Sequence, residues 1–412
     1  MDSRVIKQIS VLMATVFVDM IGFTIVLPQL PFYATRLGAN ASLVGMLIAA
    51  HPFAQLAVSP LWGRLSDRLG RRPLILAGLL LSAVAYVLFG MAEAIWLLFV
   101  SRLVQGAGGG IIGVVQAYVA DAVEPEQRTK ALGWLTAATS AGVMIGPEVG
   151  SYAFKALGQE GPGFVAAGLC LLNVLFAWKW LPEPKRYSTP ASELAVQTEA
   201  PRRSLWRSFR DVLAHPTSPV SSLIWVYTIG MMAFMAMNGT LALYLKDEFG
   251  VNEGNIGHFY FYVGAISVIM RAVLLGPAVR RFGEVGVTRL GALALTLGLA
   301  GIPLARGPLS LALVILFVPV GTALLFPATT SQVSRLSSRV EMGQILGVQQ
   351  SFGGISRMIG PLWAGVVYQH LGRPFPYWLA AALMLSVSFL TLRIHQEERR
   401  AGALKAEAVD GA

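Results

Sequence analysis

The stretch Gly63-Arg-Leu-Ser-Asp-Arg-Leu-Gly-Arg-Arg72 is a short basic turn between two long apolar runs. A related stretch, Gly276-Pro-Ala-Val-Arg-Arg-Phe-Gly283, lies about half a chain later and also separates two apolar runs. At the same spacing, to within one residue, three further pairs recur: Leu132-Gly133 with Leu346-Gly347, Gly146-Pro147 with Gly360-Pro361, and Leu157-Gly158 with Leu371-Gly372. Agreement among four landmarks indicates an internal repeat, so we expect two structurally similar halves.

The composition places the chain in lipid. It has 412 residues, of which 55% are hydrophobic and 13% charged, and its mean hydropathy is +0.62. So few charges cannot coat a soluble protein of this size. Twelve apolar stretches are long enough to cross a hydrocarbon core about 30 Å thick, at approximately 9–34, 41–62, 73–92, 95–120, 130–156, 162–182, 219–245, 255–277, 287–305, 309–332, 344–370 and 374–394. Backbone groups cannot stay unpaired in hydrocarbon, and these runs are too long for barrel strands. We therefore predict an all-α membrane protein with twelve transmembrane helices in two pseudo-symmetric six-helix bundles.

The distribution of Lys and Arg predicts the topology. An even number of crossings puts both termini on one side, and most of the 32 Lys and Arg residues fall in tails and loops on that side. The positive-inside rule then places both termini in the cytoplasm. Because the net charge of +10 is spread over these short turns, it does not indicate a nucleic-acid partner.

Residues 183–218 form the one long interruption between the apolar stretches. We predict an N-terminal bundle at 1–182, a cytoplasmic linker at 183–218, a C-terminal bundle at 219–395 and a cytoplasmic tail at 396–412. In the linker, Trp206 and Phe209 lie among Arg203, Arg207 and Arg210. This pattern fits either a short amphipathic helix on the anionic inner leaflet or an irregular charged tether.

The sequence offers no cofactor chemistry. It has no G-x-x-x-x-G-K-[ST] phosphate loop, no metal-binding spacing of Cys and His, and a single cysteine, Cys170. No grouping of nucleophile, base and metal indicates an enzyme. We expect no cofactor and no metal. Repeated helical halves with a site between them are a transporter arrangement, and uphill transport must then draw on an ion gradient.

The fixed positions of the first stretch match the pattern G-x-x-x-D-R-x-G-R-[RK] at Gly63, Asp67, Arg68, Gly70, Arg71 and Arg72. The stretch resembles the loop signature of the major facilitator superfamily. Three further stretches resemble its drug:proton antiporter branch with twelve helices, most closely the tetracycline-exporter-like members: Asp19-Met-Ile-Gly22, Arg102-Leu-Val-Gln-Gly106 and Gly142-x-x-x-Gly146-Pro147-x-x-Gly150.

The resemblance implies a secondary active multidrug efflux transporter that exchanges protons for amphipathic small molecules by alternating access. It also implies a bacterial-type cytoplasmic (inner) membrane, and we expect the chain to act as a monomer. The alternative is a lipid or metabolite carrier of the same fold, with or without proton coupling. Three departures from the branch pattern argue against tetracycline itself as the substrate: Ala85 in place of an acid, Glu148 in place of an apolar residue, and Ser151 in place of a second glycine.

Ionisable side chains at bilayer depth are costly, so each needs a partner or an aqueous cavity. At a rise of about 1.5 Å per residue, Asp19 and His51 both lie near the midplane, where they could meet. Asp19 is a candidate proton carrier or a counter-ion for a cationic substrate; otherwise it holds the first segment to the fourth. Desolvation and neighbouring charges would tune its proton affinity. His51 fits a packing histidine better than a proton relay.

Arg102 and Glu148 lie at almost the same depth on consecutive segments, about 11 Å and about 12 Å below their external ends. We therefore predict an ion pair or a water-bridged pair between them. The pair is a coupling element if substrate or proton competes for Glu148, and a buried structural bridge if neither does. The resemblance implies a role in proton coupling for Arg102.

Gly142, Gly146 and Gly150 recur every four residues on one helical face, where small residues let another helix approach closely. Pro147 interrupts the local hydrogen-bond ladder and allows a bend. Either this face slides against the opposite half during alternating access, or it is plain small-residue packing. Glu148 points away from it, about 200° around the helix.

The charges of the first stretch, Asp67, Arg68, Arg71 and Arg72, lie where the second segment ends in water. They are either snorkelling charges or a gate. By resemblance, the Asp of this loop caps a helix of the other half when the transporter opens outward, and Asp67, Asp121 and Arg128 match the gate positions. In the second copy Arg280 replaces the Asp, so we expect an asymmetric lock.

Arg357 lies about 20 Å into the eleventh segment, with Gln350 two turns earlier on a similar face. Substrate contact and structural anchoring are both open for Arg357, and in a lipid carrier it would bind an anionic headgroup. Asn238 is a further polar candidate in a cavity lined by aromatic side chains such as Phe234 and Phe326. The candidate coupling and substrate residues are therefore Asp19, Arg102, Glu148, His51, Arg357, Gln350 and Asn238.

Overall fold

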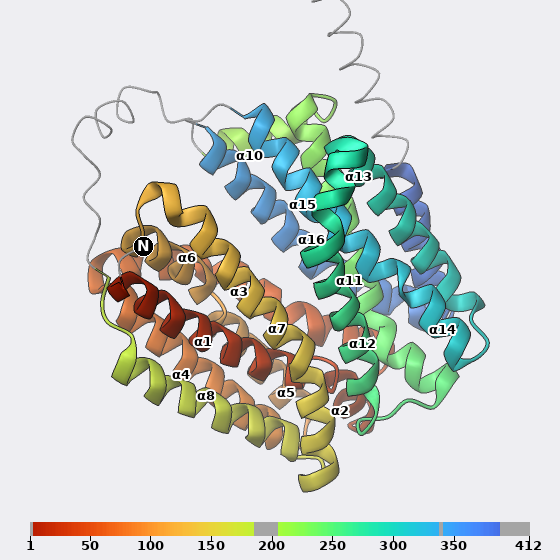
Figure 1. Cartoon of the computed structure of the whole chain (residues 1–412). Helices are drawn as coiled ribbons and strands as arrows, with labels where there is room; N and C mark the ends of the chain where they lie inside the picture. Colours follow the sequence, from red (N-terminus) through yellow and green to blue (C-terminus); the bar gives the residue numbers. More distant parts are fainter. Residues whose placement is uncertain (1–2, 185–204, 338–340, 388–412) are drawn as a thin grey trace, which may run out of the picture. The chain divides into compact units, whose positions relative to one another are not determined.

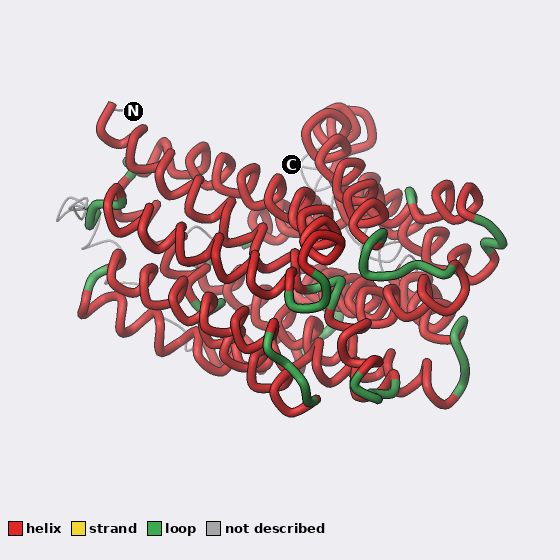
Figure 2. Tube along the Cα trace, turned by 90° about the horizontal axis from the view of Figure 1, so that it is seen from below, coloured by secondary structure: helices red, strands yellow, loops and turns green. Residues whose placement is uncertain are grey.

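The computed structural model describes residues 3–184, 205–337 and 341–387, and every regular element in these ranges is a helix (Figures 1 and 2). The first half of the chain contributes α1 (Ser3–Val26), α2 (Leu30–Arg36), α3 (Ala41–Leu69), α4 (Arg71–Gly90), α5 (Ile95–Gly108), α6 (Ile111–Ala122), α7 (Pro125–Leu157) and α8 (Gly161–Trp180). The second half contributes α10 (Leu205–Ala214), α11 (Pro219–Phe249), α12 (Ile256–Ile269), the π-helix η1 (Met270–Leu274), α13 (Leu275–Gly301), the 3-10 helix η2 (Ile302–Leu304), α14 (Pro308–Ile315), α15 (Phe317–Leu336), α16 (Met342–His370) and a helix at Phe375–Val387.

These helices account for the predicted transmembrane segments and confirm the all-α architecture. Within the described ranges, 8 helical stretches are long and apolar enough to cross a membrane, and one of them, Ile256–Leu304, has 49 residues and covers two predicted crossings. The long helices α7 and α16, with 33 and 29 residues, and the shorter apolar helix at Phe375–Val387 match the remaining segments. The predicted tail at 396–412 lies outside the described residues.

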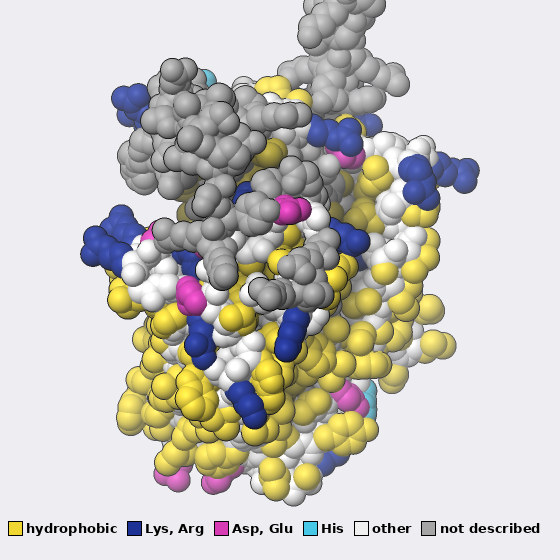
Figure 3. Space-filling view, turned by 60° about the vertical axis from the view of Figure 1, so that its left-hand side comes forward, with side chains coloured by type: hydrophobic (Ala, Val, Ile, Leu, Met, Phe, Trp, Pro, Cys, Tyr) yellow, Lys and Arg dark blue, Asp and Glu magenta, His cyan; other side chains and the backbone are white. Residues whose placement is uncertain are grey.

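The surface of the described residues fits contact with lipid rather than with water. Trp178, Leu172 and Leu309 are 64%, 63% and 75% exposed. Hydrophobic side chains cover much of the face shown in Figure 3. Apolar exposure on this scale is unusual for a monomer in water and expected for a surface that faces acyl chains.

Both copies of the repeated stretch contain a glycine with positive φ. Gly70 has φ 98° and ψ 162° and separates α3 from α4, while Gly283 has φ 68° and ψ 169° and interrupts α13. Glycine adopts this backbone conformation freely, whereas residues with a Cβ are strained in it. The chain therefore turns at equivalent places in the two halves, and the Gly283 turn separates the predicted segments 255–277 and 287–305.

The chain forms two compact units. Unit 1 comprises Met1–Ala191, Asn238–Val268 and Pro361–Gly372. In it, α1 packs against α7 and α8, α4 packs against α5 and α8, and α3 packs against α5. These contacts bring the middle of α1 into the same interior as α4, α5 and α8.

Unit 2 comprises Ser192–Met237, Ile269–Gly360 and Arg373–Ala412, and in it α13 packs against α15. The linker contributes α10, so its helical alternative is the one observed. The apolar side of α10 is partly buried within unit 2, while Leu213 is 50% exposed. Val212 is buried in a core cluster, and Phe209 stacks on Phe352 of α16 with 4.6 Å between ring centroids. Arg203 lies outside the described residues.

Candidate transport site and gates

Asp19 lies in the interior of unit 1, two-thirds of the way along α1. Its side chain is partly exposed, and it interacts electrostatically with Tyr86 of α4 and Cys170 of α8. Within the described part of the chain the carboxylate forms neither a hydrogen bond nor an ion pair. The ring of Tyr86 packs closely against α1 at Gly22. A Cβ built on this glycine would lie only 3.2 Å from Cε2 of the ring. The neighbours of Asp19 thus come from the predicted third and sixth segments, and among the described residues no hydrogen bond or ion pair joins it to the fourth.

Arg102 is the largest fully buried side chain of the described residues, at 1% exposure. Its Nε, Nη1 and Nη2 atoms have no hydrogen-bond partner among those residues. The guanidinium lies over the ring of Phe89, with 5.4 Å between its Cζ and the ring centroid, and it interacts electrostatically with Tyr86. Tyr86 is therefore a shared neighbour of Arg102 and Asp19. A buried cation without a hydrogen-bond partner among the described residues is expensive, so a contribution to stability does not account for Arg102.

His51 lies on α3 beside aromatic and glycine neighbours. Its ring centroid is 5.0 Å from that of Phe23 on α1, and a Cβ built on Gly109 would lie 3.3 Å from its Nε2 atom. The backbone of His51 also sets the close approach of α3 to α5, since a Cβ on Gly106 would lie 2.2 Å from the His51 carbonyl oxygen. These contacts support packing as one role of the residue.

Glu148 pairs with His258 of α12, at 2.7 Å between Oε1 and Nδ1. The predicted pair of Arg102 with Glu148 is wrong. Arg102 faces Phe89 and Tyr86, whereas Glu148 faces His258. His258 was not a candidate from the sequence. Its only signal was its place near the start of the predicted eighth segment.

The face of α7 that carries Gly142, Gly146 and Gly150 packs against α1. Cβ atoms built on these glycines would lie 2.6 Å from the Phe17 carbonyl oxygen, 2.7 Å from that of Ile21 and 2.7 Å from that of Ile25. The prediction that this face slides against the opposite half is therefore wrong, and close packing within one six-helix half is its role. The prediction that Glu148 points elsewhere is confirmed by its contact with α12.

Gly146→Ala is expected to lower the free energy of unfolding by about 1–3 kcal/mol, because the added methyl group overpacks the α1–α7 contact. Its Cβ would lie 2.1 Å from Thr24 Oγ1 as well as near the α1 backbone. Gly133→Ala on the same helix is the matched control, since nothing lies within 4 Å of its Cβ. Thermal unfolding of the purified variants checks this. Equal melting temperatures would mean that the contact does not limit stability.

A second group of contacts joins α7 and the α1–α2 connection to the start of α12. Ser151 Oγ accepts a hydrogen bond from the Gly257 amide at 2.9 Å and donates one to the Glu253 carbonyl oxygen at 2.8 Å. Gln29 Nε2 donates to the same carbonyl oxygen at 3.0 Å, and Arg36 forms an ion pair with the Glu253 carboxylate. The serine that departs from the branch pattern thus bridges two helices.

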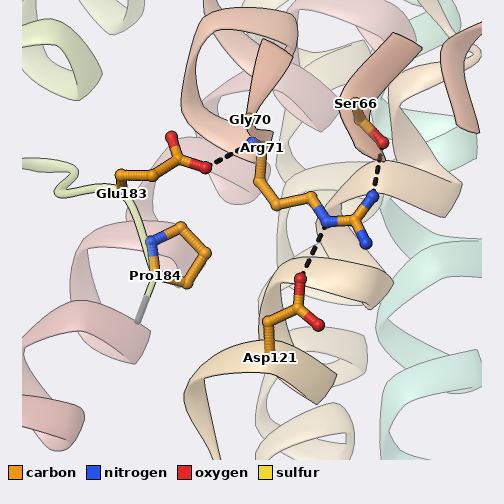
Figure 4. Close-up of a pocket in the computed structure, with 6 residues that line it drawn as sticks. All are labelled: Ser66, Gly70, Arg71, Asp121, Glu183 and Pro184. Carbon is orange, nitrogen blue, oxygen red and sulfur yellow. Dashed lines mark hydrogen bonds and ion pairs between the residues drawn. The ribbon is translucent and has the colours of Figure 1, made fainter. Parts of the chain in front are cut away.

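The charges of the first repeated stretch converge where α3 ends and α4 begins (Figure 4). Arg71 pairs with Asp67 at 2.8 Å and with Asp121 of α6 at 2.9 Å, and it also donates to Ser66 Oγ. The Glu183 carboxylate accepts hydrogen bonds from the backbone amides of Arg71 and Arg72, and these bonds cap the start of α4. A Cβ on Gly70 would lie 2.8 Å from that carboxylate. The turn therefore needs glycine both for its positive φ and for this close approach.

The remaining charges of the predicted gate lie around this centre. Arg72 donates to the Trp178 carbonyl oxygen, Arg128 donates to that of Val123 at 3.2 Å, and Arg68 is exposed. Gly63 has open space where a Cβ would lie. The structure therefore brings Asp67, Arg71 and Asp121 together and leaves Arg128 attached to the loop before its own helix.

The second repeated stretch builds the same centre with opposite charges. Glu284 follows Gly283 as Arg71 follows Gly70. Its carboxylate pairs with Arg335 of α15 at 3.1 Å and accepts a hydrogen bond from Ser331 Oγ at 2.6 Å. Arg335 occupies the position that Asp121 holds in the first half, just as Arg280 occupies that of Asp67. The expected asymmetry thus extends to all three charges of the centre.

In unit 2, Arg357 lies near the middle of α16 and is partly buried. It interacts electrostatically with Tyr227 of α11, whose hydroxyl also lies within reach of the Gln350 side chain. Tyr227, Phe326 and Phe234 form a chain of rings, with centroid distances of 5.3 Å and 6.3 Å. Of the predicted substrate residues, Arg357 and Gln350 come together, whereas Asn238 belongs to unit 1.

Comparison with known proteins identifies the architecture. Residues 12–361 match the sequence model of the Major Facilitator Superfamily. The chain belongs to this superfamily. It is similar to Multidrug resistance protein 1 of Bacillus subtilis (strain 168), at 27% identity over 93% of the chain and 95% of that protein. It is also similar to Tetracycline resistance protein, class B, of Escherichia coli, at 26% identity over 91% of each. The solved structure of the human organic anion transporter MFSD10 (TETRAN) shares its fold, with a TM-score of 0.67 and 23% identity over 95% of the chain and 100% of that structure.

This major facilitator chain is therefore a secondary transporter of small molecules, an integral multi-pass membrane protein and not an enzyme. The resemblance of Gly63–Arg72 to the superfamily loop signature is confirmed. So is the resemblance to efflux proteins of the drug and tetracycline type. Because these relatives are only 26–27% identical to the chain, the substrate is argued from the site.

Proposed function

We propose that this transporter exports amphipathic small molecules from the cytoplasm in exchange for protons, by alternating access, with both termini in the cytoplasm. Asp19 carries the proposal. It is a carboxyl group inside a membrane-spanning helix, partly accessible and without a hydrogen-bond or ion-pair partner in the described part of the chain. An acid at that depth is functional by default, because an ion there needs water, a partner or a proton.

Asp19, Tyr86 and Arg102 form the proposed coupling site. When Asp19 carries a proton, the guanidinium of Arg102 is the uncompensated charge of this interior; when the proton leaves, carboxylate and guanidinium offset each other across Tyr86. Gaining or losing one proton therefore changes the electrostatic cost of the buried Arg102. That dependence gives the proton a means to bias which state of the transporter is stable.

Polar contacts near the ends of the long helices form the proposed gates. Glu148 with His258 and Ser151 with Glu253 hold α12 against α7 on the proposed external side. The Arg71 and Glu284 centres lie on the proposed cytoplasmic side. We propose that the bundles at 1–182 and 219–395 rock about the site, and that the contacts of α7 with α12 break and form as they do so.

A lipid or metabolite carrier of the same fold is the second candidate. Arg357 favours it, because a guanidinium at bilayer depth can hold a phosphate or carboxylate headgroup. If that carrier works without proton coupling, Asp19 would be dispensable for transport.

Proton movement in proteoliposomes tests the proposal. Protein is reconstituted with pyranine in the lumen, and ethidium, 2-naphthoate and labelled phosphatidylglycerol are added in separate experiments. Antiport is expected to change the lumenal pH only with protein and a transported small molecule present. Movement of the labelled lipid without any proton flux would favour the carrier and reject antiport.

A further inference from the structure

Arg357, Tyr227, Gln350, Phe326 and Phe234 form a cluster in unit 2, hereafter the Arg357 cluster. The helices that carry it are fixed against each other by close contacts. Ser356 Oγ donates to the Thr228 carbonyl oxygen at 2.9 Å, which joins α16 to α11 beside Arg357 and Tyr227. A Cβ on Gly353 would lie 2.8 Å from Cε1 of Tyr227, so a glycine of α16 makes room for the ring. These contacts fix α11 and α16, which carry Tyr227 and Arg357, close to each other.

The charge of Arg357 is not compensated within its unit. Among the described residues of unit 2, the only acids are Asp211, Glu284 and Glu341. Asp211 belongs to the linker helix, Glu284 pairs with Arg335, and Glu341 precedes α16, about 24 Å along the helix from Arg357. No carboxylate in the described part of unit 2 thus lies at the depth of Arg357, so its guanidinium is a candidate to bind an anion.

The rings beside Arg357 offer a surface for a planar aromatic group. Phe326 meets both Tyr227 and Phe234 edge-on, with interplanar angles of 64° in each pair. Phe326, Phe234 and Arg357 are partly exposed rather than sealed in the core, and Gln350 is exposed. Aromatic faces next to a few polar groups are typical of small-molecule sites.

We propose that the Arg357 cluster is a substrate site for aromatic organic anions. The guanidinium would donate two parallel hydrogen bonds to a carboxylate or sulfonate, the Gln350 amide would offer one more, and the aromatic body would pack against Phe326 and Phe234. This assignment rests on the proposed transport function and names its substrate class. A lipid headgroup without an aromatic ring would bind the Arg357 guanidinium but would make no ring contact with Phe326 or Phe234.

Binding of a matched set of naphthyl compounds tests the assignment. The full-length protein is placed in nanodiscs of phosphatidylcholine, and binding of 2-naphthoate, 2-naphthamide and 2-naphthyltrimethylammonium is measured by calorimetry. The carboxylate is expected to bind at least about tenfold more tightly than the amide, the neutral compound of equal shape, because it gains charge-assisted hydrogen bonds. Equal affinities for carboxylate and amide would overturn the proposal.

Variants assign the preference to the cluster. Arg357→Gln should remove the preference for the carboxylate, and Arg357→Lys should keep part of it. Arg271→Gln is the matched control, because Arg271 lies in η1 of the same unit and outside the cluster. Phe326→Leu should weaken the carboxylate and the amide by the same factor, which keeps the proposal testable if an Arg357 variant misfolds. A preference that survives in Arg357→Gln would overturn it.

Competition separates an aromatic anion from a lipid headgroup. 2-Naphthalenesulfonate is expected to displace 2-naphthoate, whereas phosphatidylglycerol in the nanodisc is not; the reverse result would assign Arg357 to lipid and overturn the proposal. The assay needs no proton gradient. Naphthoate binding without proton flux would reject antiport alone, and proton flux driven by ethidium without naphthoate binding would reject this site alone.

Discussion

Asp19→Asn is expected to abolish substrate-driven proton movement in proteoliposomes, by about 100-fold or more, because asparagine has the shape of the protonated acid but cannot release a proton. Substrate binding should persist, since the amide resembles the neutral state of the site. With asparagine at position 19, no negative charge would offset the buried guanidinium of Arg102, as in the protonated state of Asp19. The measurement is the rate of lumenal pH change after substrate addition, corrected for the amount of protein in the membrane.

Two variants control for general damage. Asp19→Glu retains a titratable group one methylene further along and should retain measurable coupling. Glu93→Gln removes an exposed carboxylate from the loop between α4 and α5 and should leave coupling unchanged. Full proton movement in Asp19→Asn would exclude Asp19 from the mechanism and with it the proposed coupling site.

Arg102→Met is expected to stabilise the protein while it stops transport. The guanidinium is 1% exposed and its nitrogens have no partner among the described residues, so replacing it with an apolar side chain of similar length removes a buried charge. Where buried ion pairs were replaced by apolar residues of similar volume, the change was often neutral or stabilising by about 1–4 kcal/mol. We expect a higher melting temperature together with loss of substrate-driven proton movement.

The contrast with a paired arginine makes this result specific. Arg36→Met removes a half-exposed guanidinium that pairs with Glu253, and it should lower the melting temperature or leave it unchanged. A lower melting temperature for Arg102→Met would show that Arg102 contributes to the stability of the fold, and unchanged transport would show that it is dispensable for coupling.

The fold was accessible from the sequence because it depends on patterns that persist along the chain. Apolar runs of bilayer length fix the helices, and the recurrence of Gly63–Arg72 at Gly276–Gly283 fixes the repeat. The turn at each copy follows from a glycine that the sequence places at the same position, and both glycines do have positive φ.

The contacts of the site were less accessible, because depth along a helix does not give direction around it. Arg102 and Glu148 lie at similar depth, yet one faces Tyr86 and the other faces His258. Direction could be predicted only where a reference face existed on the same helix, as it did for Glu148 relative to Gly146 and Gly150. The partner His258 is far along the chain and carries no motif, so nothing in the sequence connects it to Glu148.

The opposite polarity of the Arg71–Asp121 and Glu284–Arg335 pairs limits how far the halves remain interchangeable. A chimera that carried Gly63–Arg72 in place of the corresponding residues 276–285 would put an arginine of α13 beside Arg335 of α15, so that two like charges would meet. The reciprocal graft would set a glutamate beside Asp121. The two turns are thus not exchangeable, and any engineered recombinant of this chain must carry each turn together with its partner helix.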